Sequence, residues 1–348
     1  MTQQDSWNET VLQQRHQLMQ TARGYRTAQI LFSCVELGVF EAIAAGAHTA
    51  NEIAVVIQSD VRGTELVLNT AVALGWLEKR ENLFFNAPIA KTCLVRGGSG
   101  FIADTLKLES AFYRRWEHLT NAVKTGRRPE ENVRDEKPED WVRRFEYALY
   151  AMARPVAPFI ADALPLPEDR DLRVLDVGGG HGGYSIAIAQ RYPRVLATVF
   201  ELPRVVPVAR EIIAQAGMSE RVSVREGDLQ CDDLGHGYDV VLVFGVLNGE
   251  PPEGRAALIA KVFAALKPGG RIVLRDFVLD PDRAGPPEAT IFALQMLLAT
   301  NAGGLDTRDE WTCWLSTAGF APPQTIRLPE WIGTTLTVAE KPVTASKD

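Results

Sequence analysis

RVLDVGGGHGGYSIAIAQRYPRVLATVFE, residues 173–201, is the stretch from which the fold can be predicted. Its apolar start predicts a short buried strand ending at Asp176, and the glycines from Gly178 to Gly183 predict a turn. A helix with one apolar side should follow, and then a second strand that ends at Glu201. This order predicts the nucleotide-binding half of a doubly wound sheet, where ligands lie beyond the carboxyl ends of the strands.

The turn also indicates which ligand it serves. Gly178, Gly180 and Gly183 fit G-x-G-x-x-G, a spacing that dinucleotide sites share, and glycine lets the backbone approach a ligand closely. Asp176 adds a carboxylate that suits a cationic ligand better than a pyrophosphate, and Glu201 can accept both hydroxyls of a ribose. We therefore expect S-adenosylmethionine (SAM), with S-adenosylhomocysteine (SAH) as product. A nicotinamide site and a turn without a ligand remain alternatives.

Length and composition limit the class of protein. The 348 residues are enough for two domains, and 46% hydrophobic with 23% charged residues is typical of a soluble chain. A net charge of −7 argues against a nucleic-acid partner. The polar start and the lack of a long apolar run predict a cytoplasmic protein without a membrane partner. The four cysteines are far apart in the sequence, so we expect reduced thiols and no metal site.

The N-terminal part reads as helices followed by a wing. Apolar periodicity predicts helices over 10–43, 49–57 and 62–74, and short strands are expected over 76–78 and 83–86. Such a winged helix can bind DNA. The helix in the recognition position is too apolar for a groove reader, however, so a dimerisation role is the better interpretation.

The middle of the chain predicts two further helices, over 101–125 and 141–164, joined by a charged surface connection. Pro155 and Pro158 should kink the second helix.

After Glu201 strands and helices alternate, which predicts a mostly parallel sheet. The expected division is a winged-helix dimerisation domain over 1–100, helical linker and acceptor-pocket helices over 101–165, and a Rossmann-like SAM-binding catalytic domain over 166–348.

A series of motifs resembles one family. DVGGGHGGYS, FELP, REGDL, YDVVLVFGVLNGE, LKPGGRIVLRDF and LQMLLATNAGG stand in the order found in SAM-dependent O-methyltransferases of the plant caffeate and bacterial polyketide type, which have S-methylating relatives. ILFSCVELGVFEAI and VLNTAVALGWLEK resemble that family's dimerisation domain. The resemblance covers Val11 to Glu340. It implies an α/β Rossmann-like domain preceded by a mainly α winged-helix domain, a homodimer and a small-molecule methyl acceptor.

The resemblance also implies the cofactor contacts. The residues it points to lie at or just after the carboxyl ends of successive strands: Asp176, Gly178 and Gly180 at the methionine moiety, Glu201 at the ribose, Leu202, Asp228 and Leu229 at the adenine, and Phe244 as a further cofactor contact.

The catalytic position departs from the family. The histidine that removes the acceptor proton, in L-H-D-W or L-H-G-E, is replaced here by Asn248. An amide can orient a partner but does not accept a proton at neutral pH. The carboxylates that flank the family's histidine have counterparts in Asp276 and Asp306. No other histidine stands in a motif, and His181, inside the glycine turn, is expected near the cofactor.

Three explanations of Asn248 remain open. In the first, the acceptor is a thioether sulfur, which needs no base, only alignment and desolvation. The resemblance to S-methylating members then implies a thioether acid of the methylthio-hydroxybutyrate type, on the route to dimethylsulfoniopropionate. Alternatively, the reaction is O-methylation of a hydroxylated aromatic or polyketide, with Asp276 or Asp306 as base or with an acidic phenol or enol as acceptor. In the third, the chain is a non-enzymatic SAM- or ligand-binding regulator. We favour the first.

The acceptor pocket is expected among aromatic and apolar side chains that could equally be core residues: Trp116, Phe145, Tyr147, Tyr150, Phe292 and Met296. For a carboxylate-bearing acceptor, Arg115, Arg143 or Arg144 can supply a fork of donors.

Overall fold

The computed structural model describes residues 8–129 and 139–343. The chain divides into two compact units, Met1–Ala111 and Phe112–Asp348, and helix α7 (Ala103–Trp116) crosses the boundary. The finer three-part division expected from the sequence stays a prediction. Residues 130–138 of the charged connection lie outside the described part of the chain.

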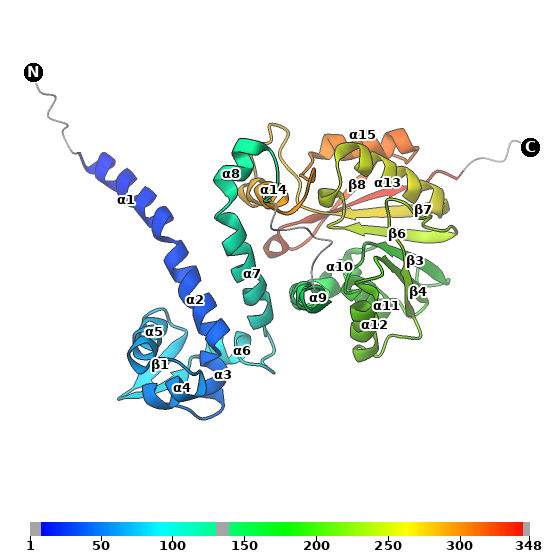
Figure 1. Ribbon diagram of the computed structural model, residues 1–348. Coiled ribbons are helices and arrows are strands. Elements are labelled where there is room, and N and C mark those ends of the chain that lie inside the picture. The colour runs from blue at the N-terminus through cyan, green and yellow to red at the C-terminus, as the bar shows by residue number, and fades with distance from the viewer. Residues whose placement is uncertain (1–7, 130–138, 344–348) are drawn as a thin grey trace, which may run out of the picture. The chain divides into compact units, whose positions relative to one another are not determined.

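The first unit contains the expected helices and wing (Figure 1). Its elements are α1 (Glu9–Arg23), α2 (Tyr25–Leu37), α3 (Val39–Ala44), α4 (Ala50–Val56), α5 (Val61–Ala73), β1 (Leu77–Arg80), β2 (Leu83–Asn86) and α6 (Pro88–Cys93). β1 and β2 form an antiparallel hairpin. The segment 10–43 is helical as expected but is divided into α1, α2 and α3, and Gly38, with φ +80°, ends α2 in the left-handed conformation that glycine tolerates.

Two features hold the first unit together. α4 begins with a capping box, in which Thr49 accepts from the Glu52 N–H and the Glu52 carboxylate accepts in return. Phe40, Leu68 and Phe84 are fully buried in one apolar cluster that joins the helices to the wing. Burial of side chains of this size contributes about 1.5–3 kcal/mol each.

The second unit is an α/β domain. In the described part of the chain, seven strands form one sheet in the order β5-β4-β3-β6-β7-β9-β8. The strands are β3 (Leu172–Val177), β4 (Val195–Glu201), β5 (Val222–Glu226), β6 (Tyr238–Phe244), β7 (Leu266–Arg275), β8 (Gln324–Arg327) and β9 (Thr335–Glu340). β3 to β7 pair in parallel, and β9 and β8 close the edge antiparallel. The mostly parallel sheet is thus confirmed.

Helices cover both faces of this sheet (Figure 1). α10 (Ala157–Ala163), α11 (Gly183–Arg191) and α12 (Val206–Gln215) share one apolar cluster with the sheet, and α13 (Pro252–Ala265) and α15 (Arg308–Ala318) share the other. The unit also contains α8 (Leu119–Thr125), α9 (Glu139–Ala153), α14 (Pro287–Ala299) and the 3-10 turns η3 (Leu247–Gly249) and η4 (Glu330–Ile332). Because both faces are covered, β3 and β6 are almost wholly buried, and most of their residues are apolar. Their carboxyl ends lie where the crossover connections reverse direction, the usual place of a ligand site.

The long helices expected in the middle of the chain are interrupted. The segment 141–164 is not one kinked helix but α9 and α10, since Pro155 lacks an N–H and disfavours helix at the residue before it. Pro158 lies in the first turn of α10, where no helical N–H is required. The helix expected over 101–125 is likewise divided into α7 and α8.

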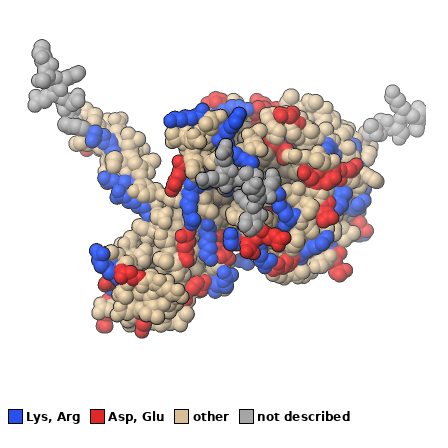
Figure 2. Space-filling view, in the orientation of Figure 1, with Lys and Arg blue, Asp and Glu red and all other residues tan. Residues whose placement is uncertain are grey.

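Charges of both signs are intermixed on the face of the protein drawn in Figure 2. Among the described residues, no helix combines the length and apolar character needed to cross a membrane.

Candidate cofactor and active site

The glycine turn after β3 has a conformation that requires glycine. Gly178 and Gly180 have φ of +62° and +50°. A Cβ on Gly178 would lie 2.8 Å from a methyl group of Val246, and one on Gly180 would lie 2.7 Å from Oε2 of Glu146. The turn therefore has neither the dihedral freedom nor the space for a side chain, and its bare backbone can approach a ligand.

Glu201 connects this turn to the end of β4. Its Oε2 accepts from the Gly180 N–H at 3.0 Å, and its Oε1 accepts from the Leu202 N–H at 2.8 Å. The carboxylate is half-buried, and each oxygen has a second lone pair. This geometry fits the predicted role of binding two ribose hydroxyls.

Asp176 lies beneath the turn. It is 1% exposed, its Oδ2 accepts from the Ser185 hydroxyl at 2.8 Å, and burial raises its pKa to about 7. A Cβ on Gly179 would lie 2.6 Å from the Asp176 carboxyl carbon. The carboxyl group supports the turn from below, and a direct contact with the cofactor stays a prediction.

Helix α9 packs on the same turn. His181 is 6% exposed, its Nδ1 accepts from the Gly183 N–H at 2.9 Å, and burial lowers its pKa to about 4, so the ring is neutral at pH 7. The ring of Tyr150 lies 5.6 Å from that of His181. Glu146, also on α9, is buried against Gly180. No sequence pattern distinguishes Glu146 from an ordinary helix residue, so it was not among the predicted site residues.

The residues expected near the adenine lie beyond β5 and β6. Asp228 and Leu229 are half-buried in the loop after β5, and Phe244 ends β6. The Asp228 carboxylate accepts from the Gln230 N–H at 2.8 Å, and Lys261 Nζ donates to the Leu229 carbonyl at 2.8 Å. Both bonds fix the loop, and the adenine contacts remain a prediction.

Asn248 and Asp276 follow the carboxyl ends of neighbouring strands. β6 and β7 are paired with Phe244 opposite Arg275, which brings the η3 turn and the residue after β7 together. Asn248 Nδ2 donates to Asp276 Oδ1 at 3.0 Å, and the Phe277 N–H donates to the same oxygen at 2.8 Å. Within the described chain, the buried Oδ2 of Asp276 has no hydrogen-bond partner.

The environment of Asp276 adjusts its proton affinity. Burial raises its pKa to about 6, whereas the bonds from Asn248 and Phe277 act in the opposite direction. The group is therefore mainly ionised at pH 7, with one oxygen open. This is the state that a general base needs.

Asp306 lies in the same region but is differently engaged. It is 4% exposed, its Oδ1 pairs with Arg255 Nη1, and its Oδ2 lies 3.4 Å from Trp311 Nε1. It is close enough to Asp276 to raise that group's pKa. Because both its oxygens are bonded, Asp306 is the poorer candidate base of the two.

Helix α14 packs against Phe277, the residue after Asp276. The rings of Phe277 and Phe292 are 4.8 Å apart, and Trp116 Nε1 donates to Gln295 Oε1 at 2.7 Å. Met296 is buried beside Gln295. Three predicted acceptor residues thus lie on or against α14, together with Gln295, which the sequence analysis missed.

The α9 candidates are placed differently. Phe145 stacks on Trp141, with ring centroids 4.8 Å apart. The Tyr147 hydroxyl donates to Glu211 Oε1 at 2.8 Å, and Arg143 forms a forked ion pair with the same carboxylate. Because its fork is engaged by Glu211, Arg143 is a poorer candidate for binding an acceptor carboxylate, a role that stays a prediction. Arg144 is exposed and Arg115 is half-buried.

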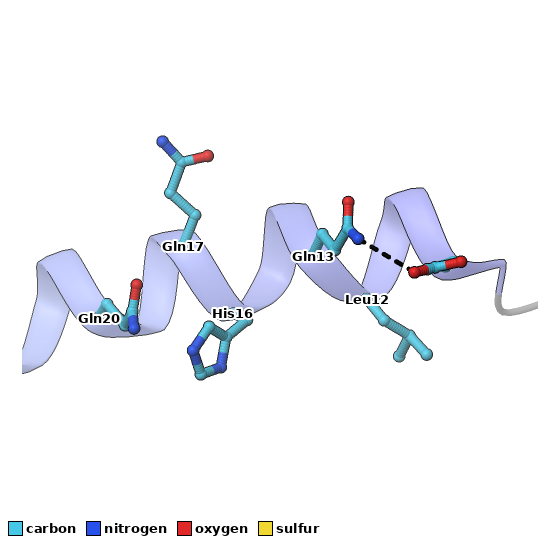
Figure 3. Close-up of a pocket in the computed structure, with 6 residues that line it drawn as sticks. Leu12, Gln13, His16, Gln17 and Gln20 are labelled. Carbon is cyan, nitrogen blue, oxygen red and sulfur yellow. Dashed lines mark hydrogen bonds between the residues drawn. The ribbon is translucent and has the colours of Figure 1, made fainter.

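A hollow elsewhere lies along α1, drawn in Figure 3, and is lined only by that helix: Glu9, Leu12, Gln13, His16, Gln17 and Gln20. A surface formed by one helix does not enclose a ligand. In residues 8–129 and 139–343, no group of His, Cys, Asp and Glu is arranged to hold a metal ion.

Comparison with known proteins gives a consistent family. Residues 169–321 match the model of the O-methyltransferase domain, and residues 19–96 match that of the O-methyltransferase dimerisation domain. The 3-hydroxy-5-methyl-1-naphthoate 3-O-methyltransferase of Streptomyces sahachiroi is 31% identical over 89% of this chain and 90% of its own. The acetylserotonin O-methyltransferase of Bos taurus is 32% identical, and the match covers 87% of this chain and 91% of the relative.

Solved structures agree. Human N-acetylserotonin methyltransferase in complex with SAM has a TM-score of 0.84 and 26% identity, covering 97% of this chain and 99% of its own. The structure of PigF with SAH has a TM-score of 0.84 and 25% identity, and the match covers 94% of this chain and 99% of PigF.

Proposed function

The chain belongs to the SAM-dependent O-methyltransferases that carry an N-terminal dimerisation domain, and from that membership we propose that it methylates a hydroxyl group of a small hydroxylated aromatic or polyketide molecule. SAM supplies an electrophilic methyl group in this family. The observation that carries the proposal is the buried Asp276, which is held at one oxygen by Asn248 and is open at the other.

In this proposal Asp276 replaces the missing histidine. As the acceptor oxygen bonds to the methyl carbon and the carbon–sulfur bond breaks, the hydroxyl proton passes to Asp276 Oδ2. Asn248 keeps the carboxylate in one orientation through its bond to Oδ1. A positioned base of this kind contributes about 10²–10⁴-fold to rate, and a pKa of about 6 leaves it ionised at neutral pH.

The cofactor is assigned to the turn after β3. We propose that the backbone at Gly178 and Gly180 lies against the methionine moiety and that Glu201 accepts the ribose hydroxyls. The positive φ values and the bare Cα atoms of the turn support this, as does the half-buried carboxylate that ends β4. Leu202, Asp228, Leu229 and Phe244 complete the proposed site on the adenine side.

S-methylation of a thioether acid is the second candidate, because Asn248 stands where the family has its base. The relatives from Streptomyces sahachiroi and Bos taurus are named as O-methyltransferases, and Asp276 offers a base, so O-methylation is the better supported of the two. The non-enzymatic alternative is set aside, because the relatives are enzymes along nearly the whole chain.

We also propose that the protein is a homodimer joined through its N-terminal unit. Helix α1 buries none of its residues within the described chain and exposes Leu12, Leu18 and Met19 by 52%, 71% and 46%. A second copy would cover this apolar surface. Light scattering of the full chain should give twice the monomer mass, and Leu18→Glu should shift it toward the monomer.

Methyl transfer to a matched pair of acceptors tests the main proposal. SAH formation is measured with a catechol and with a methylthio-hydroxy acid, using the wild type, Asp276→Asn and, as control, Asp171→Asn, whose side chain is 83% exposed. We expect the catechol to be methylated by the wild type and the control but not by Asp276→Asn. Methylation of the thioether alone, untouched by Asp276→Asn, would establish the second candidate instead.

A further inference from the structure

Arg255 is buried next to the catalytic turn. It lies on α13 and is 4% exposed. Its Nε donates to the carbonyls of Leu247 at 2.9 Å and Glu250 at 2.7 Å, and its Nη1 pairs with Asp306. Burial of a charged guanidinium carries a desolvation penalty, which is offset only when hydrogen-bond and ion-pair partners replace the lost water.

The bonds of Arg255 fix the turn that carries Asn248. Leu247 and Glu250 lie on either side of Asn248, and one nitrogen of Arg255 holds both of their carbonyls. The Asn248 carbonyl itself accepts from the Gly304 N–H at 2.9 Å. The turn is thus fastened to α13 on one side and to the segment before Asp306 on the other. A lysine has no planar fork and cannot reproduce this set of bonds.

Arg255 also sets the charge around Asp276. The groups that face Asp276 are the Asn248 amide, the Phe277 N–H and the carboxylate of Asp306. Asp306 in turn faces Arg255 and Glu310, and Glu310 pairs with Arg283 at 2.5 Å. Without Arg255, the Asp306 carboxylate would either act on Asp276 as an uncompensated like charge or take up a proton itself.

We propose that Arg255 is a positioning residue for methyl transfer, which holds the Asn248 turn in place and compensates Asp306, so that Asp276 keeps the base role. The inference rests on the proposed function. It assigns no contact between Arg255 and the substrate. It predicts that the residue acts through the rate and the pH dependence of the reaction rather than through cofactor binding.

The test compares four variants with the wild type: Arg255→Lys, Arg255→Met, the double variant Arg255→Met with Asp306→Asn, and the surface control Arg194→Met. The readouts are kcat, the pH profile of kcat/KM with a catechol, and SAH affinity by calorimetry. For Arg255→Met we expect a loss in kcat of about tenfold or more and an acid limb moved upward by roughly half a pH unit. In the double variant the Asp306 charge is also removed, so the acid limb of the kcat/KM profile should return to its wild-type pH while kcat stays low.

Arg255→Lys keeps the positive charge but loses the planar guanidinium that bonds to the turn. We therefore expect the acid limb of kcat/KM at its wild-type pH and a lowered kcat. SAH affinity should be unchanged in every variant that folds. Wild-type kcat and pH profile in Arg255→Lys and in the double variant would overturn the inference, even if Arg255→Met did not fold. A flat profile in the wild type would instead overturn the base role of Asp276, so the two failures are distinguishable.

Discussion

The amide nitrogen of Asn248 lies 3.0 Å from Oδ1 of Asp276, and each side chain is only 9% exposed. The Phe277 N–H donates to the same oxygen, so both donors act on Oδ1 and Oδ2 is left open. The position of the family's histidine is thus taken by a group that orients a neighbouring carboxylate. In the proposed mechanism, proton acceptance moves from residue 248 to Asp276, which follows the neighbouring strand β7.

Removal of the Asn248 amide should make Asp276 a worse base at low pH. The bond from Asn248 lowers the Asp276 pKa, so Asn248→Ala should raise that pKa further and shift the acid limb of kcat/KM to higher pH. We expect kcat to fall by about tenfold, in line with the loss of a hydrogen bond to a charged group. A pH profile with parallel SAH calorimetry checks this. An acid limb identical to that of the wild type would count against the pairing.

Gly180→Ala should weaken cofactor binding. The substitution combines a φ of +50° with a Cβ that would lie 2.7 Å from Glu146 Oε2. Gly217→Ala is the matched control, since Gly217 has a φ of +68° but no atom within 4 Å of its Cβ position. Both variants lose about 1–2 kcal/mol of stability from backbone strain. Only Gly180→Ala should raise the Kd for SAH, by about tenfold or more. Equal affinity in both variants would remove this turn from the cofactor site.

Asp176 should make stability depend on pH. Its pKa of about 7 in the folded protein is above its ordinary value, so the folded state binds this proton more tightly than the unfolded state. The contribution is fully present at low pH and is lost as pH rises through about 7. In the wild type, the free energy of unfolding in urea should fall by up to about 1.4 kcal/mol per pH unit between about pH 5 and pH 7 because of this group, and Asp176→Asn should lack that fall. Identical slopes in the variant and the wild type would show that the buried carboxyl does not titrate there.

Trp116→Phe should act on the acceptor and not on the cofactor. The change removes the donor to Gln295 Oε1 while keeping an aromatic ring, so the buried amide on α14 loses its orientation. We expect the KM for the acceptor to rise by about threefold to tenfold with SAH affinity unchanged. Trp331→Phe, at a side chain that is 61% exposed, is the control. A wild-type KM in Trp116→Phe would exclude this end of α14 from the acceptor pocket.

The sheet and the cofactor turn were predictable because their signals are local. A run of apolar residues such as 238–244 has to be buried on both faces of a sheet. Glycines at 178 and 180 indicate a turn whose backbone has positive φ values, which other residues rarely adopt. The break between α9 and α10 was only partly predictable. Pro155 indicated a distortion, but its size depends on how the two helices pack.

The catalytic environment was less predictable because it depends on contacts between distant segments. In the sequence, Arg255 and Gln295 are ordinary helix residues. Only the fold shows that Arg255 pairs with Asp306 and that Gln295 accepts from Trp116. Tyr147, whose place at the acceptor stays a prediction, has a contact of the same kind. Its hydroxyl is engaged by a glutamate on α12 that no local pattern connects to it.

The base role of Asp276 is tested most directly by the single-turnover rate of methyl transfer to a catechol, measured from about pH 5 to about pH 8. We predict a rate that is constant above about pH 7 and falls by about tenfold per pH unit well below pH 6, as Asp276 takes up its proton. Asp276→Asn should lower the plateau by about 10²–10⁴-fold while SAH still binds. A wild-type rate that is flat over this range, or a plateau that survives Asp276→Asn, would contradict the account.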